Sequence, residues 1–170
     1  MSKRMIGVVM LLLTLAWDAS LAAERNFSGR VEKGVTYVER GRKSLRLDVY
    51  LPEAGAAPVP AVVVIHGGGF IGGFRGMMDP LCRALAAAGM AAFNIDYRLS
   101  PRYQFPAPTE DARCALRWVA RHAKEYGADP GRLGVTGESA GAYLAAMTVF
   151  PGPVAAERTV EFFRQHLGVQ

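Results

Sequence analysis

The sequence predicts an α/β fold, in which a mostly parallel sheet carries helices on both faces and follows an antiparallel hairpin. Short apolar runs rich in β-branched residues alternate with helix-like segments between residues 61 and 147. The 170 residues are 51% hydrophobic and 21% charged, which is typical of one globular domain. The net charge of +5 comes from scattered arginines without a dense basic block. Nucleic-acid binding is therefore not predicted.

The first residues have the layout of a signal peptide. Lys3 and Arg4 precede an apolar run from Met5 to Trp17, and the small residues Ser20 and Ala22 follow it. The run is shorter than the roughly 20 residues that cross a bilayer. We expect residues 1–22 to be removed after Ala22, residues 23–170 to form the domain, and the protein to be secreted or periplasmic without stable membrane insertion. An uncleaved anchor or a buried helix is the alternative.

The strands are predicted from alternation and from β-branched runs. Residues 45–51 alternate apolar and polar side chains, and with residues 35–39 they form a hairpin around Gly41. Residues 61–65 read Ala-Val-Val-Val-Ile, which is typical of a central strand buried on both faces. Further strands are expected over residues 90–95 and 133–136, the latter after a turn at residues 129–131.

Three helices are predicted from their end signals and apolar faces. Asp79 as N-cap and Pro80 at the first helical position open a helix that ends at Gly89. A longer helix runs from Pro108 to Gly127, and another begins at Ser139. The apolar face of the first comprises Leu81, Cys82, Leu85 and Ala88, and that of the second Ala112, Ala115, Leu116, Val119, Ala120 and Ala123.

Other side chains on these helices are given ordinary structural roles. Arg113, Arg117 and Arg121 lie on one face of the long helix, which we interpret as solvated, with a docking site as the alternative. Cys82 and Cys114 are expected to be buried thiols, because two cysteines cannot build a disulfide framework. Neither has neighbours at metal-ligand spacing, so no metal site is predicted.

The pattern Gly137-x-Ser139-x-Gly141 follows the last predicted strand and opens the last helix. This is the context of a nucleophile elbow, in which a sharp turn presents a serine in strained backbone geometry. Side chains at either glycine would collide with the neighbouring strand and helix. Ser139 is therefore the candidate catalytic nucleophile.

A second glycine-rich segment, His66-Gly67-Gly68-Gly69-Phe70, directly follows the central strand. Backbone N–H groups of this segment and of Ala140 can converge on one substrate oxygen, as an oxyanion hole requires. A close-packing turn or a phosphate nest is the alternative. The chain lacks the Lys-Ser/Thr pair of a P-loop here and the Gly-x-Gly-x-x-Gly pattern of a dinucleotide site, so no cofactor is predicted.

Together these motifs resemble the hormone-sensitive-lipase-like and feruloyl/acetylxylan-esterase-like branch of α/β-hydrolases. The resemblance runs from about Tyr37 to Met147 and is carried by residues 47–52, 66–70, 96–101, 105–108, 127–132 and 137–141 with Asp111 and Trp118. It implies an α/β-hydrolase fold with Ser139 as nucleophile, Gly67, Gly68 and Ala140 as oxyanion donors, and His66, Gly69, Gly137 and Gly141 in support. It also implies that Asp96, Tyr97 and Arg98 brace the loop. Ala142 departs from the usual glycine.

The chain lacks residues suited to complete a catalytic triad. In this fold an Asp or Glu and then a His follow the serine, but after Ser139 only Glu157, Glu161 and His166 are present. His166 is a poor substitute base, and His122 is expected to be exposed or capping. Residues 154–168 resemble the final helix of these esterases, so we expect an incomplete hydrolase, truncated or internally deleted near residues 150–153.

The predicted activity is hydrolysis of carboxylic esters through a Ser139 acyl-enzyme, weak or absent without the triad Asp and His. The substrates would be small esters with short acyl or aromatic groups, including ester groups on plant polysaccharide. The alternatives are an exported serine peptidase of the prolyl-oligopeptidase type and a non-catalytic binding remnant of an esterase.

Overall fold

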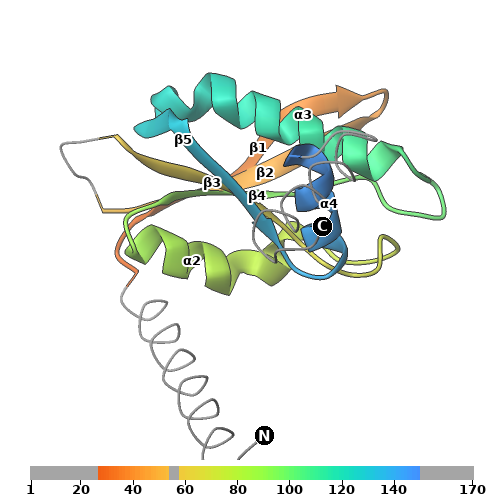
Figure 1. Cartoon of the computed structure of the whole chain (residues 1–170), viewed down its shortest axis with the longest axis horizontal. Coiled ribbons are helices and arrows are strands. Elements are labelled where there is room, and N and C mark those ends of the chain that lie inside the picture. The colour runs from red at the N-terminus through yellow and green to blue at the C-terminus, as the bar shows by residue number, and fades with distance from the viewer. Residues whose placement is uncertain (1–26, 54–57, 150–170) are drawn as a thin grey trace, which may run out of the picture.

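The computed structural model describes residues 27–53 and 58–149. These form a five-stranded sheet of order β1-β2-β4-β3-β5, with α2 on one face and α3 and α4 on the other (Figure 1). The predicted signal peptide at residues 1–22, the segment 154–168 and His166 lie outside the described residues. No helix in the described part of the chain is long and apolar enough to cross a membrane.

The sheet combines the predicted hairpin with a parallel portion. β1 (Arg30–Arg40) and β2 (Lys43–Leu51) pair antiparallel, and β2 continues antiparallel onto β4 (Ala91–Ile95). β3 (Val59–Ile65) pairs parallel with both β4 and β5 (Ala128–Gly137). The sequence therefore located each strand of the described residues, although β1, β2, β3 and β5 are longer than predicted.

The expected turn before the last strand is a bulge within β5. The pairing of β3 with β5 jumps from Pro60↔Asp129 to Ala61↔Leu133. The Asp129 side chain accepts a hydrogen bond of 2.8 Å from the Gly131 N–H, which closes the extra residues into a local loop. Beyond the bulge the ladder runs in register to Gly137, and β5 is the outer strand of the described sheet.

The first helix differs from the prediction at its start and in its buried face. α2 (Asp79–Ala87) follows a 3-10 turn, η1 (Arg75–Met78), and its N-cap is Met78. The prediction of Asp79 as N-cap is wrong because its carboxylate instead binds Lys33 Nζ, at 3.0 Å. The predicted apolar face is wrong in part: Cys82 and Ala86 are buried, Leu85 packs beside them, and Leu81 and Ala88 are exposed.

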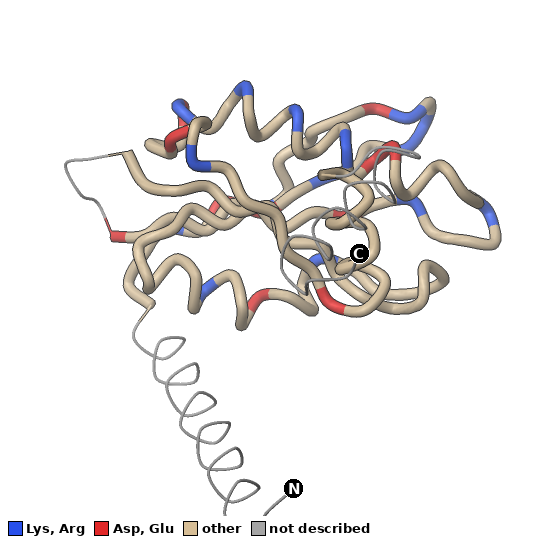
Figure 2. The backbone as a smooth tube through the Cα atoms, in the orientation of Figure 1, with Lys and Arg blue, Asp and Glu red and all other residues tan. Residues whose placement is uncertain are grey.

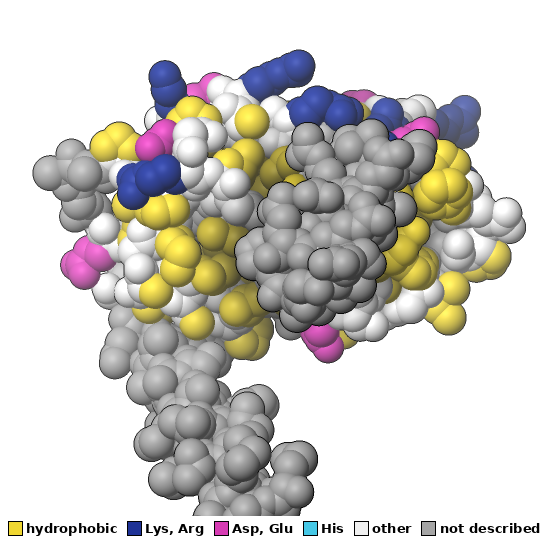
Figure 3. Space-filling model, in the orientation of Figure 1, with side chains coloured by type: hydrophobic (Ala, Val, Ile, Leu, Met, Phe, Trp, Pro, Cys, Tyr) yellow, Lys and Arg dark blue, Asp and Glu magenta, His cyan; other side chains and the backbone are white. Residues whose placement is uncertain are grey.

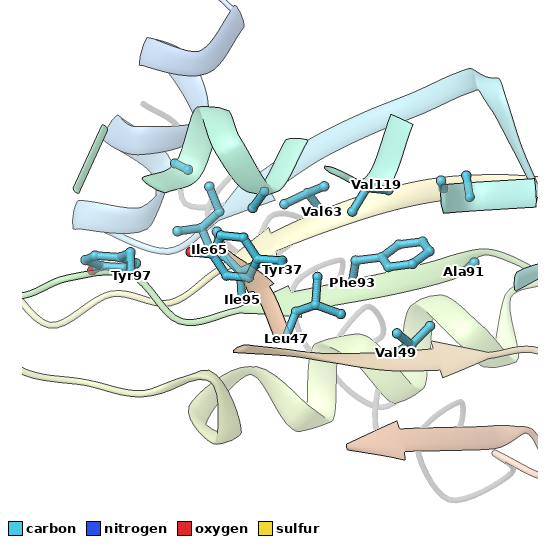
Figure 4. Close-up of a cluster of buried hydrophobic side chains, with 14 of the residues drawn as sticks. Tyr37, Leu47, Val49, Val63, Ile65, Ala91, Phe93, Ile95, Tyr97 and Val119 are labelled. Carbon is cyan, nitrogen blue, oxygen red and sulfur yellow. The ribbon is translucent and has the colours of Figure 1, made fainter. Parts of the chain in front are cut away.

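The second helix covers the opposite face of the sheet. α3 (Ala107–His122) continues into a 3-10 turn, η2 (Ala123–Tyr126), and Gly127 ends it with a φ of 69°. Ala112, Ala115, Val119 and Ala123 are fully buried, as predicted, although Ala120 is exposed. Figure 4 shows Val119 of this helix against Val63 and Phe93 of the sheet.

Two side-chain predictions on the helices need adjustment. Basic residues line α3 in Figure 2, and Arg117 and Arg121 are exposed. Arg113 is not simply solvated, because its Nη2 donates to the Met147 carbonyl oxygen of α4 (Ala140–Val149) at 2.9 Å. Cys82 is a buried free thiol, as predicted, whereas Cys114 is only partly buried beside the core.

Candidate active site

The two glycine motifs leave neighbouring strands at the same edge of the sheet. In the parallel pairing of β3 with β5, Ile65 stands opposite Gly137. The ladder continues one residue further, because the Glu138 N–H donates to the Ile65 carbonyl oxygen at 3.2 Å. The segments 66–70 and 137–141 therefore begin side by side at the carboxyl ends of the strands, where α/β folds place their sites.

Ser139 occupies a tight turn between β5 and α4. Its φ is 49°, in the left-handed region that residues with a side chain rarely adopt. The turn is closed on both sides of the serine: the Gly141 N–H donates to the Glu138 carbonyl oxygen at 2.7 Å, and the Tyr143 N–H to that of Ser139 at 3.2 Å. Ser139 itself is exposed, so its hydroxyl is accessible to a substrate.

The glycines that flank the serine are required by space, as predicted from the motif. A Cβ at Gly137 would lie 2.5 Å from the Gly141 carbonyl oxygen and 2.8 Å from that of Ile65. A Cβ at Gly141 would lie 2.1 Å from the Ile65 carbonyl oxygen. Contacts this short with backbone atoms cannot be relieved by a rotamer change, so the elbow packs backbone to backbone against β3.

The loop after β3 curls over the same elbow. Gly68, Gly69 and Phe70 all have positive φ, and the N–H groups of Ile71 and Gly72 both donate to the Gly68 carbonyl oxygen, at 3.2 and 3.0 Å. A Cβ at Gly67 would lie 3.5 Å from the Cβ of Ser139. The structure thus brings the predicted oxyanion loop into contact with the predicted nucleophile. The N–H of Ala140, in the first turn of α4, has no intrahelical acceptor.

Neither histidine in the described ranges contacts Ser139. His66 is 1% exposed, stacks on Tyr97 with ring centroids 4.3 Å apart, and directs Nδ1 to the Gly67 carbonyl oxygen at 2.7 Å. Burial lowers the pKa of His66 below its usual value, which favours the neutral ring. His122 Nδ1 lies 2.8 Å from the Trp118 carbonyl oxygen. Both rings are therefore structural.

The bracing residues implied by the resemblance divide into two groups. Tyr97 donates its hydroxyl to the His66 carbonyl oxygen at 3.1 Å, and an Asp96 carboxylate oxygen accepts from the Arg75 N–H at 2.9 Å, so both hold the glycine loop. Arg98 instead donates to Asp111 in α3, with Nε 2.7 Å from Oδ2.

Asp111 is a buried charge that the sequence did not single out. It is fully buried and binds Arg40 as well as Arg98, with Arg40 Nε 3.1 Å from Oδ1. In the sequence, Asp111 stands only among the residues that carry the family resemblance, with no role assigned to it. The stronger signal, its place between two arginines, depends on tertiary structure. Among the described residues, no group of three or more His, Cys, Asp or Glu side chains is placed to hold a metal ion.

A cavity of about 330 Å³ opens beside the elbow. Phe70, next to the glycine loop, and Tyr143, one turn after Ser139, form one wall, with their rings edge to face at 5.8 Å. Phe105, Pro108, Thr109 and Ser100 complete the lining, which contains no charged side chain. Hydrophobic side chains also gather at the corresponding end of the surface, on the right in Figure 3. The cavity suits an uncharged, apolar group.

Residues 47–165 match the BD-FAE family. The chain belongs to this family. Among curated relatives, esterase LipI of Mycobacterium tuberculosis is 46% identical over 92 residues, covering 54% of this chain and 29% of LipI. The solved esterase of Pyrobaculum calidifontis is 40% identical with a TM-score of 0.66, covering 84% of this chain and 46% of that one. Esterase 2 of Thermogutta terrifontis, phosphorylated by paraoxon, is 32% identical with a TM-score of 0.66, covering 74% and 49%.

These comparisons establish the fold of this BD-FAE chain. Its structural neighbours are esterases of the α/β-hydrolase fold, and its sheet and helices form part of that fold. The predicted fold class is therefore confirmed. The chain spans less than half the length of each of these relatives.

Proposed function

We propose that this chain is the nucleophile-bearing part of a carboxylic ester hydrolase in which Ser139 forms the acyl-enzyme. The observation that supports the proposal is the closeness of Gly67 to Ser139, an exposed serine with a φ of 49°: a Cβ at Gly67 would lie 3.5 Å from the serine Cβ. The names of the relatives support the same chemistry, since LipI and both solved neighbours are called esterases.

In the proposed reaction, Ser139 Oγ attacks the ester carbonyl carbon and loses its proton to a base. The carbonyl oxygen gains negative charge, and in this proposal the N–H groups of Gly67, Gly68 and Ala140 stabilise it. Collapse of the tetrahedral intermediate releases the alcohol and leaves an acyl group on Ser139. Water then attacks the acyl carbon, and the carboxylic acid leaves with the serine regenerated.

In this proposal neither described histidine supplies the base, because neither His66 nor His122 forms a hydrogen bond with Ser139 and each directs Nδ1 to a backbone carbonyl oxygen. We therefore propose that the 170-residue chain reacts slowly at Ser139, retaining the contribution of the oxyanion donors and substrate binding. His166 and the acids near it lie outside the described residues. Substitution of His166 by Ala tests whether it acts as the base.

The proposed substrates are small esters with a short acyl or aromatic group. The cavity beside Ser139 supports this choice, because its lining is apolar and its volume of about 330 Å³ is at the small end for ligand sites. Ester groups on plant polysaccharide are one such class. Export through residues 1–22, giving a secreted or periplasmic protein, is compatible with a substrate of that kind.

The test compares the 170-residue chain with its Ser139→Ala variant on a 4-nitrophenyl acyl ester and a peptidyl nitroanilide. Slow, Ser139-dependent release of nitrophenol with no cleavage of the anilide supports the esterase. Preferential cleavage of the anilide would favour the peptidase. Binding of the ester without any turnover would favour a non-catalytic remnant. The structural observation in favour of this alternative is that neither described histidine forms a hydrogen bond with Ser139.

A further inference from the structure

Arg75 fixes the far end of the glycine loop to the sheet through both its backbone and its side chain. Its N–H donates to Asp96 Oδ1 at 2.9 Å, and its carbonyl oxygen accepts from Asn94 Nδ2 at 2.6 Å. Its guanidinium forms one ion pair with Asp96 and another with Asp48. In the second pair Arg75 Nε lies 2.8 Å from Asp48 Oδ1, but the two atoms are not aligned for a hydrogen bond. Asp48 and Asn94 stand opposite each other in the pairing of β2 with β4.

Two partners of Arg75, one carboxylate and one amide, are buried. Asp48 is 2% exposed and Asn94 is fully buried. Burial opposes ionisation of Asp48, but contacts from Arg75, the Gly34 N–H and Lys33 together lower the pKa of Asp48 below its usual value. Asp48 is therefore a carboxylate at neutral pH, and its charge is balanced by Arg75, which is shared with Asp96, and by Lys33.

The loop turns back on itself between its glycines and Arg75. A Cβ at Gly73 would lie 2.5 Å from the Gly67 carbonyl oxygen and 2.6 Å from His66 Nδ1. Gly73, two residues before Arg75, therefore packs closely on residues 66–67, and Gly67 in turn lies close to Glu138 and Ser139. A displacement of Arg75 would therefore be transmitted to the N–H groups beside the serine through two backbone contacts.

We propose that Arg75 is a positioning residue, which holds the glycine loop over Ser139 by bridging the carboxylates of Asp48 and Asp96. The proposal rests on the proposed function, because the loop matters to the reaction only if Ser139 is the nucleophile. The planar guanidinium is suited to this task, since it reaches two carboxylates at once while a lysine ammonium is a single point charge.

The experiment measures phosphorylation of the 170-residue chain by paraoxon, a diethyl 4-nitrophenyl phosphate. Ser139 Oγ forms a bond to phosphorus, the bond to 4-nitrophenolate breaks, and the serine proton is released to the buffer. Saturation kinetics separate the binding constant from the first-order rate of phosphorylation. The variants are Arg75→Met and Arg75→Lys, with Arg117→Met as the control because Arg117 is exposed on α3.

We expect Arg75→Met to slow the phosphorylation step by about 10-fold to 100-fold with little change in binding, because a misplaced loop affects the transition state most. Arg75→Lys should recover part of the rate, and Arg117→Met should match the wild type. An unchanged rate in Arg75→Met, or an equal loss in Arg75→Met and Arg75→Lys, would overturn the positioning role.

Amide hydrogen exchange separates this inference from the proposed function. If the wild-type chain is not phosphorylated, the proposed nucleophile fails, and the loop is then tested by exchange at Ile71 and Gly72, whose N–H groups bind the Gly68 carbonyl oxygen. Arg75→Met should speed their exchange about tenfold or more while Val63 and Phe93 in the sheet are unchanged. Unchanged loop amides would overturn the inference. Should Arg75→Met not fold, Asp96→Asn, which weakens the same bridge, replaces it.

Discussion

Gly67 and Ser139 lie close together on two loops that leave different strands: a Cβ on Gly67 would lie 3.5 Å from the serine Cβ and 3.1 Å from the Glu138 carbonyl oxygen. A methyl group fits there only if one loop moves by a few tenths of an ångström. We expect Gly67→Ala to slow Ser139 phosphorylation by about tenfold or more, while the free energy of unfolding changes by less than about 1 kcal/mol. Paraoxon kinetics and urea unfolding measure the two effects. A loss of stability without a loss of rate would contradict the role of this contact.

Gly141→Ala is expected to damage the fold itself. The added Cβ would lie 2.1 Å from the Ile65 carbonyl oxygen and 2.6 Å from that of His66, and neither backbone group can rotate away. We expect a loss of about 3 kcal/mol or more in the free energy of unfolding. Gly134→Ala is the matched control, because the nearest atom to its added Cβ would be the Ala61 carbonyl oxygen at 4.0 Å. This variant should change the free energy of unfolding by less than about 0.5 kcal/mol. Equal unfolding midpoints in urea would refute the packing argument.

The strain at Ser139 can be measured without any reaction. The φ of Ser139 is 49°. The variant Ser139→Ala keeps a Cβ in this strained conformation, whereas Ser139→Gly removes the Cβ and with it the strain. We expect the glycine variant to be more stable than the alanine variant by about 0.5 to 1 kcal/mol. Glycine avoids the cost of the left-handed conformation, and part of this gain is offset because the unfolded chain is more flexible at glycine. At the exposed helical residue Ala120, glycine should instead cost about 1 kcal/mol. If glycine were less stable than alanine at both positions, the backbone of the elbow would be shown to be unstrained.

Asp111 should contribute strongly to stability through its two arginines. Because Asp111 is fully buried, Asp111→Asn leaves Arg40 and Arg98 without their shared carboxylate, and we expect a loss of about 3 kcal/mol. Glu110→Gln tests an exposed partner of the same Arg98, 3.3 Å away, and should cost less than about 1 kcal/mol. Urea unfolding of both variants measures the contrast. Similar losses would mean that burial of Asp111 has no special effect.

The stability of the fold should fall in mild acid because of His66. Burial lowers the pKa of His66 in the folded state below 6.5, so above pH 6.5 the ring is neutral in both states and its contribution is complete. As the pH falls below 6.5, the unfolded chain takes up a proton first, and stability declines by up to about 1.4 kcal/mol per pH unit until the folded-state pKa is reached.

His66→Gln isolates this effect. The glutamine cannot titrate, so the stability advantage of the wild type over His66→Gln should shrink between pH 7.5 and pH 5.5 in urea titrations. A difference that stays constant over this range would show that the His66 ring is not held neutral.

The sequence predicted those features that depend on local chemistry. The β-branched run at residues 61–65 is typical of a buried strand. At Gly137 and Gly141 only glycine fits, because any Cβ would collide with backbone carbonyl oxygens of β3 or α4. The same reasoning located the loop at Gly67. Such positions tolerate few residues, so their identity carries structural information.

The features that escaped prediction depend on partners from distant elements. Asp79 resembles a helix cap in sequence, but Lys33 from β1 binds its carboxylate. Arg75 has no distinctive sequence context, and its importance depends on Asp48 in β2 and on Asp96, which directly follows β4. Charged residues are suited to many surfaces, so their partners become evident only once the strand order is known.

The pairing of β3 with β5 also sets when the site can form during folding. The chain between Ile65 and Gly137 must first build α2, β4 and α3, and closing so long a loop costs entropy that the late contacts have to offset. Helical signal can therefore develop in partly folded chains in which Gly67 and Ser139 are still apart. We expect Gly67 and Ser139 to come together late in assembly, so that Ser139 reactivity during refolding would be a kinetic marker for docking of β5.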